Sequence, residues 1–503
     1  MRAATRIIAL LPLLGAAGCM VGPDYEAPDQ TDLVPESWLD TDDHSAAVVI
    51  AAWWTLLEDA ELSDAIERAL VSNLTLAEAR ERVIAARARR GIENADRLPR
   101  LDGSASYGRA ETGDEGINFA GPPPGQDIDL YALGVVAGWE ADLWGRVGRL
   151  VEAADAEIEV ASEDLAASQV ALAAEVAREV IRIRTLDRDT ALIRATVQNN
   201  RDALDIANAR AEAGFGDELD VARAQRDLDS NLSLLPPNLA DRREAEFRLA
   251  VLLGGTPGSV TVASASLPRR DIVPQKGVPA DLLLRRPDLR RAERSLAAAT
   301  ARIGAAKALW YPRVSLSGSI TLQGPDPEDA INPDAFSLLA GPTITIPLFE
   351  GGRIRSQVQQ AESGQRQVLI QLQALTLSAL AEVETASMQR VRAEERAARL
   401  ADAERAALDA EELALDRFTA GQADFLAVTE ARQSRLALER TRTLAEQDAL
   451  FRLVDLYSAL GGGWDAPDAV SLAELPATSD ARAPVGTRKT VTSKFDREAK
   501  AGR

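Results

Sequence analysis

Alternation of apolar and polar residues, clearest in the second half of the chain, predicts four short strands. Val314 to Gln323 places Val, Leu, Gly, Ile and Leu on one face and Ser, Thr and Gln on the other, a period of two that is typical of a strand. The run Ala340 to Leu348 alternates likewise, and Leu101 to Tyr107 and Tyr131 to Trp139 form a weaker pair. Such strands suit an outer-membrane barrel, with lipid on one face and water on the other. A half-buried soluble sheet would show the same pattern, so both interpretations stay open.

Two proline-free runs of about seventy residues follow the strand pairs, from Gly145 to Ala213 and from Gly352 to Ala420. Each predicts a helix roughly 100 Å long at 1.5 Å per residue. Apolar and small residues recur there at steps of four and three, which is the coiled-coil repeat. The positions are Val147, Val151, Ala154, Ile158, Ala161, Leu165, Ser168 and Leu172 in the first run, and Ile354, Val358, Ala361, Gln365, Val368, Leu372, Leu375 and Ala379 in the second. Because many of them are alanine, each helix needs neighbours on more than one side.

Each long helix is expected to end in a tight tip. Gly214 and Gly421 supply the left-handed conformation that stops a helix. Asp217 and Asp424 are placed to cap a returning helix a few residues later. We therefore expect one long helical hairpin in each half of the chain. Pro236-Pro237 is expected to break the first returning helix. Shorter helices are expected before each strand pair, at 62–71, 75–97 and 288–310.

The predicted elements occur in the same order in both halves of the chain. Eight positions between Ala79 and Pro99 recur 213 residues later, between Ala292 and Pro312. The segment from Ala213 to Ala224 returns 207 residues later, as does Leu253-Gly254-Gly255. A register kept over two hundred residues indicates a duplicated structural unit. We expect a first repeat at 58–255 and a second at 256–464.

The N-terminus reads as an export signal followed by a modified cysteine. Residues 1–18 combine Arg2 and Arg6 with an apolar run and small residues, the pattern of a signal peptide. Cys19, the only cysteine, follows at once and resembles the modified cysteine of a bacterial lipobox. An ordinary signal peptide that happens to end at a cysteine is the alternative. Residues 19–57 are expected to form an extended, lipid-anchored arm and 465–503 a largely irregular tail.

Composition excludes several function classes. The formal charge of −21 argues against a nucleic-acid partner. No enzyme is predicted, because the one histidine, His44, lies in the polar arm and the chain shows neither a His/Cys cluster for a metal nor a Gly-rich phosphate loop. We expect no metal and no cofactor beyond the covalent lipid on Cys19. Any pumping energy would have to come from a partner.

Together these features resemble the TolC-type outer-membrane factor family, in its lipoprotein (OprM/NodT-like) branch. The likeness rests on four pieces of sequence. They are Cys19-Met20-Val21-Gly22-Pro23-Asp24-Tyr25 with Pro28, the doubled Ala-Gly tips, the segment Leu282 to Leu289, and Trp310-Tyr311-Pro312 before a strand.

The resemblance implies a mixed α/β membrane protein in the cell outer membrane, extending into the periplasm. Three chains would each give two β-hairpins to one 12-stranded barrel and their long helices to a periplasmic helical barrel. The shorter helices would stack end to end, and a belt would draw on residues around 255 to 285. The homotrimer would be the exit duct of a tripartite efflux system for small molecules and drugs. Its partners would be a periplasmic adaptor, an inner-membrane pump and outer-membrane lipid.

The resemblance also assigns roles to single residues. Leu426 and Glu430 match the positions that close the periplasmic end of the duct, and the tips at Gly214 and Gly421 match those that bind the adaptor. Taken alone, Leu426 would be a coiled-coil core residue and Glu430 a solvated one. Relatives often carry an arginine three residues after the acidic position, where this chain has Gln433. A duct for type I protein secretion and a surface-anchored coiled-coil scaffold or adhesin remain alternative functions.

Overall fold

The computed structural model of this chain describes residues 20–29, 32–35, 37–39, 52–111, 127–215, 217–270 and 286–462. The predicted signal peptide at 1–18, Cys19, His44 and the tail at 465–503 lie outside the described residues.

The four predicted strands form one antiparallel sheet in the order β1-β2-β3-β4. Its strands are β1 (Arg100–Glu111), β2 (Asp127–Ala141), β3 (Arg313–Gly324) and β4 (Phe336–Thr345). Two short 3-10 helices, η3 (Asp329–Ile331) and η4 (Pro333–Ala335), precede β4. The sheet joins the two halves of the chain, because β2 of the first half pairs with β3 of the second.

The register puts the predicted apolar positions of all four strands on one face. Across β1, β2 and β3, Gly103 lies opposite Val135, which lies opposite Ile320. Across β3 and β4, Ile320 faces Leu338. Since neighbouring residues in register share a face, the apolar face is continuous across the sheet. The other face carries Ser315, Ser317, Ser319 and Thr321 of β3.

The prediction for the fourth strand was wrong by several residues. We expected it to run from Ala340 to Leu348, whereas β4 is Phe336–Thr345. Phe336 and Leu338 extend the apolar alternation backwards, opposite Leu322 and Ile320. Pro347 lacks the N–H that a further ladder bond would need, so the strand ends before it.

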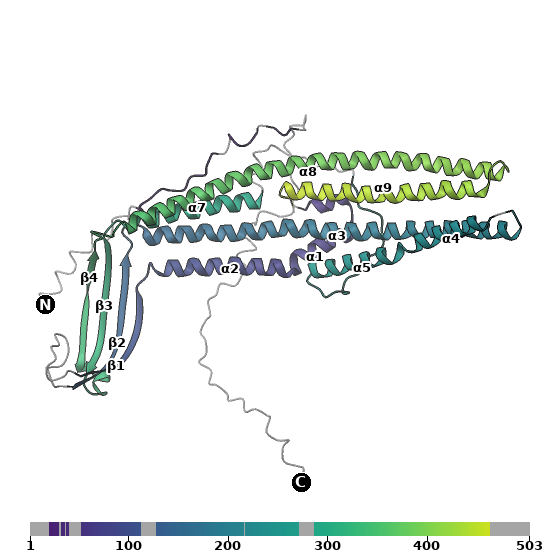
Figure 1. Cartoon of the computed structure of the whole chain (residues 1–503). Coiled ribbons are helices and arrows are strands. Elements are labelled where there is room, and N and C mark those ends of the chain that lie inside the picture. Colours follow the sequence, from purple (N-terminus) through teal and green to yellow (C-terminus); the bar gives the residue numbers. More distant parts are fainter. Residues whose placement is uncertain are drawn as a thin grey trace, which may run out of the picture. The chain divides into compact units, whose positions relative to one another are not determined.

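Two helices of 67 residues dominate the fold (Figure 1). They are α3 (Arg146–Glu212) and α8 (Arg353–Thr419), and all sixteen predicted coiled-coil positions on them are buried or half-buried. The shorter helices pack along them. These are α1 (Ala60–Ser72), α2 (Leu74–Ala95), α4 (Glu218–Leu232), α5 (Leu235–Leu252), α7 (Pro287–Ala308) and α9 (Phe425–Ala459). The sheet lies at one end of the long helices and both tips at the other.

Equivalent helices of the two repeats end in the same motif. At each Ala-Gly tip the N–H of the glycine donates to the carbonyl of the residue three positions earlier. The N–H of the residue after the glycine donates to the carbonyl five positions before it. Gly254-Gly255 and Gly461-Gly462 close α5 and α9 in the same way. This is the Schellman motif, which satisfies carbonyls that the helix leaves free. The motif occurs at four places, which form two pairs, and the members of each pair lie 207 residues apart. This recurrence confirms the duplicated architecture.

The short helices meet end to end, as the resemblance implied. Asn73, the N-cap of α2, donates from Nδ2 to the carbonyl of Leu252 at 2.8 Å. In the second half, Arg286 before α7 donates from Nη1 to the carbonyl of Ala459, at the end of α9, at 2.9 Å. The expected break at Pro236-Pro237 is confirmed, because α4 ends at Leu232 and α5 begins at Leu235.

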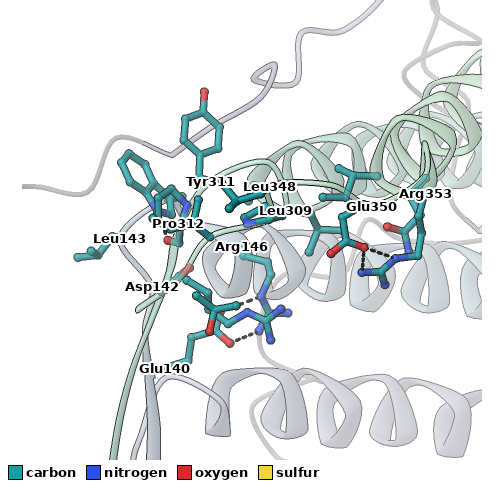
Figure 2. A pocket seen from close by; sticks show the side chains of 18 of the residues that line it. Glu140, Asp142, Leu143, Arg146, Leu309, Tyr311, Pro312, Leu348, Glu350 and Arg353 are labelled. Carbon is teal, nitrogen blue, oxygen red and sulfur yellow. Dashed lines mark hydrogen bonds and ion pairs between the residues drawn. The ribbon is translucent and has the colours of Figure 1, made fainter. Parts of the chain in front are cut away.

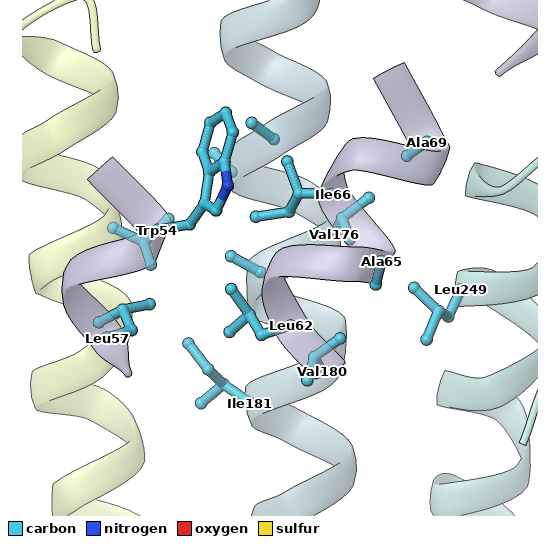
Figure 3. Packing of buried hydrophobic residues seen from close by; sticks show 14 of the residues in the cluster. Trp54, Leu57, Leu62, Ala65, Ile66, Ala69, Val176, Val180, Ile181 and Leu249 are labelled. Atoms are coloured by element: carbon cyan, nitrogen blue, oxygen red, sulfur yellow. The ribbon is translucent and has the colours of Figure 1, made fainter. Parts of the chain in front are cut away.

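The largest hydrophobic cluster lies where these short helices meet α3. Leu62 and Ile66 of α1 pack toward Val176, Val180 and Ile181 of α3 (Figure 3). Of the belt expected around 255 to 285, Val262 joins this cluster. Residues 271–285 lie outside the described part of the chain.

One end of the predicted arm belongs to this cluster and is not extended. Trp53–Leu57 forms a 3-10 helix, η2, and Trp53 is only 1% exposed. Its ring stacks on Tyr457 of α9 at 5.2 Å between centroids. The arm prediction failed here because a Trp-Trp pair can pack against helices that are distant in sequence, which local composition does not reveal.

Candidate channel elements and their relatives

The sheet exposes its apolar face and both of its edges. Val135, Ile320 and Leu338, at matching positions of three strands, are all largely exposed. Strands β1 and β4 are the edges, and neither pairs with a further strand in the described part of the chain. An exposed apolar face with open ladder groups invites a partner on each edge and an apolar surrounding on that face.

No helix in the described ranges combines the length and the apolar character needed to cross a membrane. Within those same residues, His, Cys, Asp and Glu nowhere gather in a group of three or more that could hold a metal ion.

The segment after Cys19 is fixed at the junction of sheet and helices. The N–H of Val21 donates to the carbonyl of Trp144 at 3.1 Å. Arg149 of α3, almost fully buried, donates to the carbonyl of Val21 at 3.3 Å and to Asp24 at 2.7 Å. Tyr25 reaches Glu293 of α7 with its hydroxyl. These contacts place residues 21–25 at the base of the sheet, where its strands meet the helices.

Two glycines make this contact possible. Gly22 has φ +104°, and a Cβ there would lie 2.4 Å from the Cα of Gly304 on α7. A Cβ at Gly304 would lie 2.7 Å from the carbonyl oxygen of Val21. Neither position has room for a side chain, so Gly22 is needed for its backbone conformation and both for close approach.

A cavity of about 530 Å³ lies at the same junction. In Figure 2, Arg146 points to Glu140, with Nε 3.0 Å from the carboxylate, and Glu350 pairs with Arg353. Leu348 and Phe349 on its wall are each 91% exposed. This end of the molecule thus combines polar pairs with strongly exposed apolar side chains, which is characteristic of a membrane–water boundary.

The two tips are linked by an ion pair between the repeats. Arg210, in the last turn of α3, pairs with Asp424, the N-cap of α9. The hydrogen bond from Arg210 holds the pKa of Asp424 below its ordinary value. Gly214 and Gly421 have φ +77° and +71°, and a Cβ at either would meet open space. Both tips are therefore free surfaces whose backbone requires glycine.

Leu426 and Glu430 lie one turn apart on the exposed side of α9. Leu426 is 53% exposed and Glu430 is exposed, whereas Val428 and Thr429 between them are buried. Leu426 is thus not a core residue within this chain. The neighbouring Arg432 turns away and pairs with Glu411 of α8 at 2.8 Å.

The sequence reasoning missed the contacts that hold this part of α9. Asn199 of α3, 3% exposed, donates from Nδ2 to the carbonyl of Thr429 at 3.2 Å. The Arg210–Asp424 pair was also missed. Asparagine inside a long helix was a signal, because a buried amide needs a partner; nothing local indicated which partner.

Comparison with known proteins defines the class to which this fold belongs. The model of the family "Outer membrane efflux protein" matches residues 65–255 and 278–462. The chain therefore belongs to the outer membrane efflux protein family. This agrees with the predicted resemblance.

Relatives and solved structures match over almost the whole chain. The chain is 30% identical over 469 residues to outer membrane protein OprJ of Pseudomonas aeruginosa, covering 91% of this chain and 96% of that protein. It is 31% identical over 485 residues to nodulation protein T of Rhizobium leguminosarum bv. viciae, covering 94% and 97%. The structure of the outer-membrane channel OprN superposes with a TM-score of 0.77 at 32% identity, covering 89% of this chain and all of that one.

The chain is accordingly an outer-membrane channel component of an efflux system, extends into the periplasm and is not an enzyme. The long helices are part of the channel, which sets aside the scaffold or adhesin alternative.

Proposed function

We propose that three copies of this chain close into one duct that carries small molecules passively across the periplasm and outer membrane. The main support for this proposal is that the four-stranded sheet is open at both edges within the described residues. Four strands cannot close a barrel, and open edges are not tolerated in lipid. Twelve strands from three copies can close one, with β4 of each copy beside β1 of the next.

The helices support the same assembly. The edge helix α8 exposes Ile370, Leu377 and Met388, and α2 and α5 at the other side of the chain expose Ile92 and Val251. Apolar side chains exposed along both sides of a helical layer favour a closed ring. With no nucleotide site predicted, the duct relies on an inner-membrane pump and a periplasmic adaptor for energy and cargo.

A homotrimer is expected when the full-length protein is measured in mild detergent by native mass spectrometry. The mass should be three times that of the mature chain, and boiling should convert the species to monomers with a shift in gel mobility. Folded monomers in unboiled samples would contradict the closed barrel.

We further propose that Cys19 carries the lipid anchor. The arm fixed by Val21 and Arg149 brings Met20 against Gly145, at the base of the sheet. Cys19 precedes Met20 directly, so a lipid there would enter the leaflet that faces the periplasm.

Mass spectrometry of the mature N-terminus is expected to show a diacylated or triacylated cysteine. Cys19→Ser should lose the acyl mass while the protein stays in the membrane fraction, because one lipid is only a supplementary attachment beside the sheet. Met20→Ala is the matched control and should keep the lipid. An unmodified N-terminus at another residue would refute this assignment.

The periplasmic end provides the gate and the adaptor surface in this proposal. Leu426 and Glu430, exposed on α9, would meet their copies near the threefold axis and form an apolar constriction and an acidic ring. The open tips at Gly214 and Gly421 would bind the adaptor, since a partner can approach their backbone closely.

A further inference from the structure

A cavity of about 480 Å³ lies near the tips, between α3, α4 and α9. It is formed within one chain and is separate from the pocket at the base of the sheet. One wall comes from α3 between Asn199 and Arg210, the second from α4, and the third from the first turns of α9. Its volume suits a molecule of drug size.

Among the residues that the structure describes, the charges around this cavity are paired except for one carboxylate. Asp424 is bound by Arg210. Asp220 lies 3.6 Å from Arg223, and Asp227 lies 2.5 Å from Arg226. Glu430 has no ion pair or hydrogen bond with any of the residues that the structure describes. A single unneutralised negative charge favours a ligand with one positive charge.

Part of the remaining lining is apolar and aromatic, while Asn200, Thr429 and Gln433 add polar side chains. Ile206, Phe425 and Leu426 line it, together with Phe215. Phe215 is 84% exposed at the α3–α4 tip and stacks on no other ring in the described ranges. An exposed aromatic face beside a lone carboxylate offers both contact area and a cation–π surface to an aromatic cation.

A buried polar atom on the α3 wall lacks a partner. The amide of Asn199 uses Nδ2 to bond the carbonyl of Thr429, and its Oδ1 accepts no hydrogen bond from a described residue. Burying an acceptor without a donor costs about 1–3 kcal/mol. A bound water would supply the missing donor.

We infer that this cavity binds monocationic aromatic amphiphiles, with Glu430 neutralising the charge and Phe215 and Phe425 contacting the aromatic body. The site differs from the gate proposed above, because one chain forms it. Glu430 belongs to both, so an occupied cavity removes a charge from the acidic ring.

Tetraphenylphosphonium and tetraphenylborate provide a probe pair of the same shape and opposite charge. Calorimetric titration of the full-length protein in detergent, corrected with protein-free micelles, is expected to show saturable binding of the cation to one site per chain. The anion is expected to show only the partitioning measured with the micelles. Equal saturable binding of both ions, or no binding of the cation, would overturn the inference.

Two single-residue variants test whether the cation binds in this cavity. Glu430→Gln is expected to weaken cation binding about tenfold, since a tenfold change corresponds to about 1.4 kcal/mol. Phe215→Ala, at a position too exposed to matter for folding, is expected to weaken it severalfold. Glu412→Gln removes an exposed carboxylate from α8 outside the cavity and should leave binding unchanged.

Binding unchanged in both Glu430→Gln and Phe215→Ala would refute the site even if the ion binds elsewhere. The outcome is independent of the gate, because equilibrium binding is measured without conduction. Failure of the proposed gate would appear as unchanged conductance with cation binding intact.

Discussion

Replacing Leu426 and Glu430 together with alanine is expected to raise single-channel conductance in planar bilayers severalfold and to weaken cation preference. Both side chains are exposed on the same side of α9, one turn apart. Threefold symmetry would place three leucines around a narrow pore, where an apolar constriction sheds water, and three glutamates that attract cations. Shortening the leucine widens and wets the constriction, and removing the carboxylate removes the selectivity.

The chain offers a matched control for this experiment. Leu408 and Glu412 of α8 have the same residue types at the same spacing, and both are exposed. Their double alanine variant should conduct like the wild type. If the Leu426/Glu430 variant also conducts like the wild type, the two residues are ordinary helix positions and the constriction lies elsewhere on the tips.

Arg184→Met is expected to be the most destabilising single substitution that the structure indicates, at about 3–5 kcal/mol. The Arg184 side chain is 3% exposed and binds Asp59 from Nε at 2.8 Å and Glu61 at 3.0 Å. It also donates to the carbonyl of Ala263 at 2.9 Å. One guanidinium thus holds the N-terminus of α1 and the segment after α5 against α3. Methionine would fill the volume and leave the largely buried carboxylate of Asp59 unpaired.

Hydrogen exchange read by mass spectrometry checks this most directly, because a large membrane assembly rarely unfolds reversibly. Exchange should rise in η2, α1 and residues 260–270 of Arg184→Met. Arg188→Met, one turn further along α3, removes a half-buried pair with Glu439 and should cost only about 1 kcal/mol. Adding Asp59→Asn to Arg184→Met should recover part of the loss, since asparagine still caps α1. Equal exchange in both single variants would contradict the buried-pair explanation.

Much of the fold was predictable from local sequence. The strand faces, both long helices and both tips were predicted correctly, because period-two and heptad patterns and helix-stopping glycines act within a few residues. The start of β4 was predicted at Ala340 and lies at Phe336. The residues before Ala340 follow a turn-rich segment, and the apolar–polar alternation there covers too few residues to indicate a strand. Trp53–Leu57 was misread because the ring on which Trp53 stacks, that of Tyr457, lies 404 residues further along the chain.

The candidate site divides in the same way. Leu426 and Glu430 could be named from the family pattern, but their exposure became visible only in the folded chain. The unpaired state of Glu430 also depends on Arg432 turning to Glu411 of α8. A helix pattern gives the face of a residue and leaves open what packs against that face.

The sequence by itself determined the duplication, the element order and the amphipathic faces, since each of these is a property of spacing along one segment. The tertiary structure decided the strand register between the halves, the Gly22–Gly304 contact, the Arg184 cluster and the Arg210–Asp424 pair. Each of these joins residues at least 79 positions apart. Their energies come from burial and geometry that exist only when the segments meet, so no local pattern encodes them.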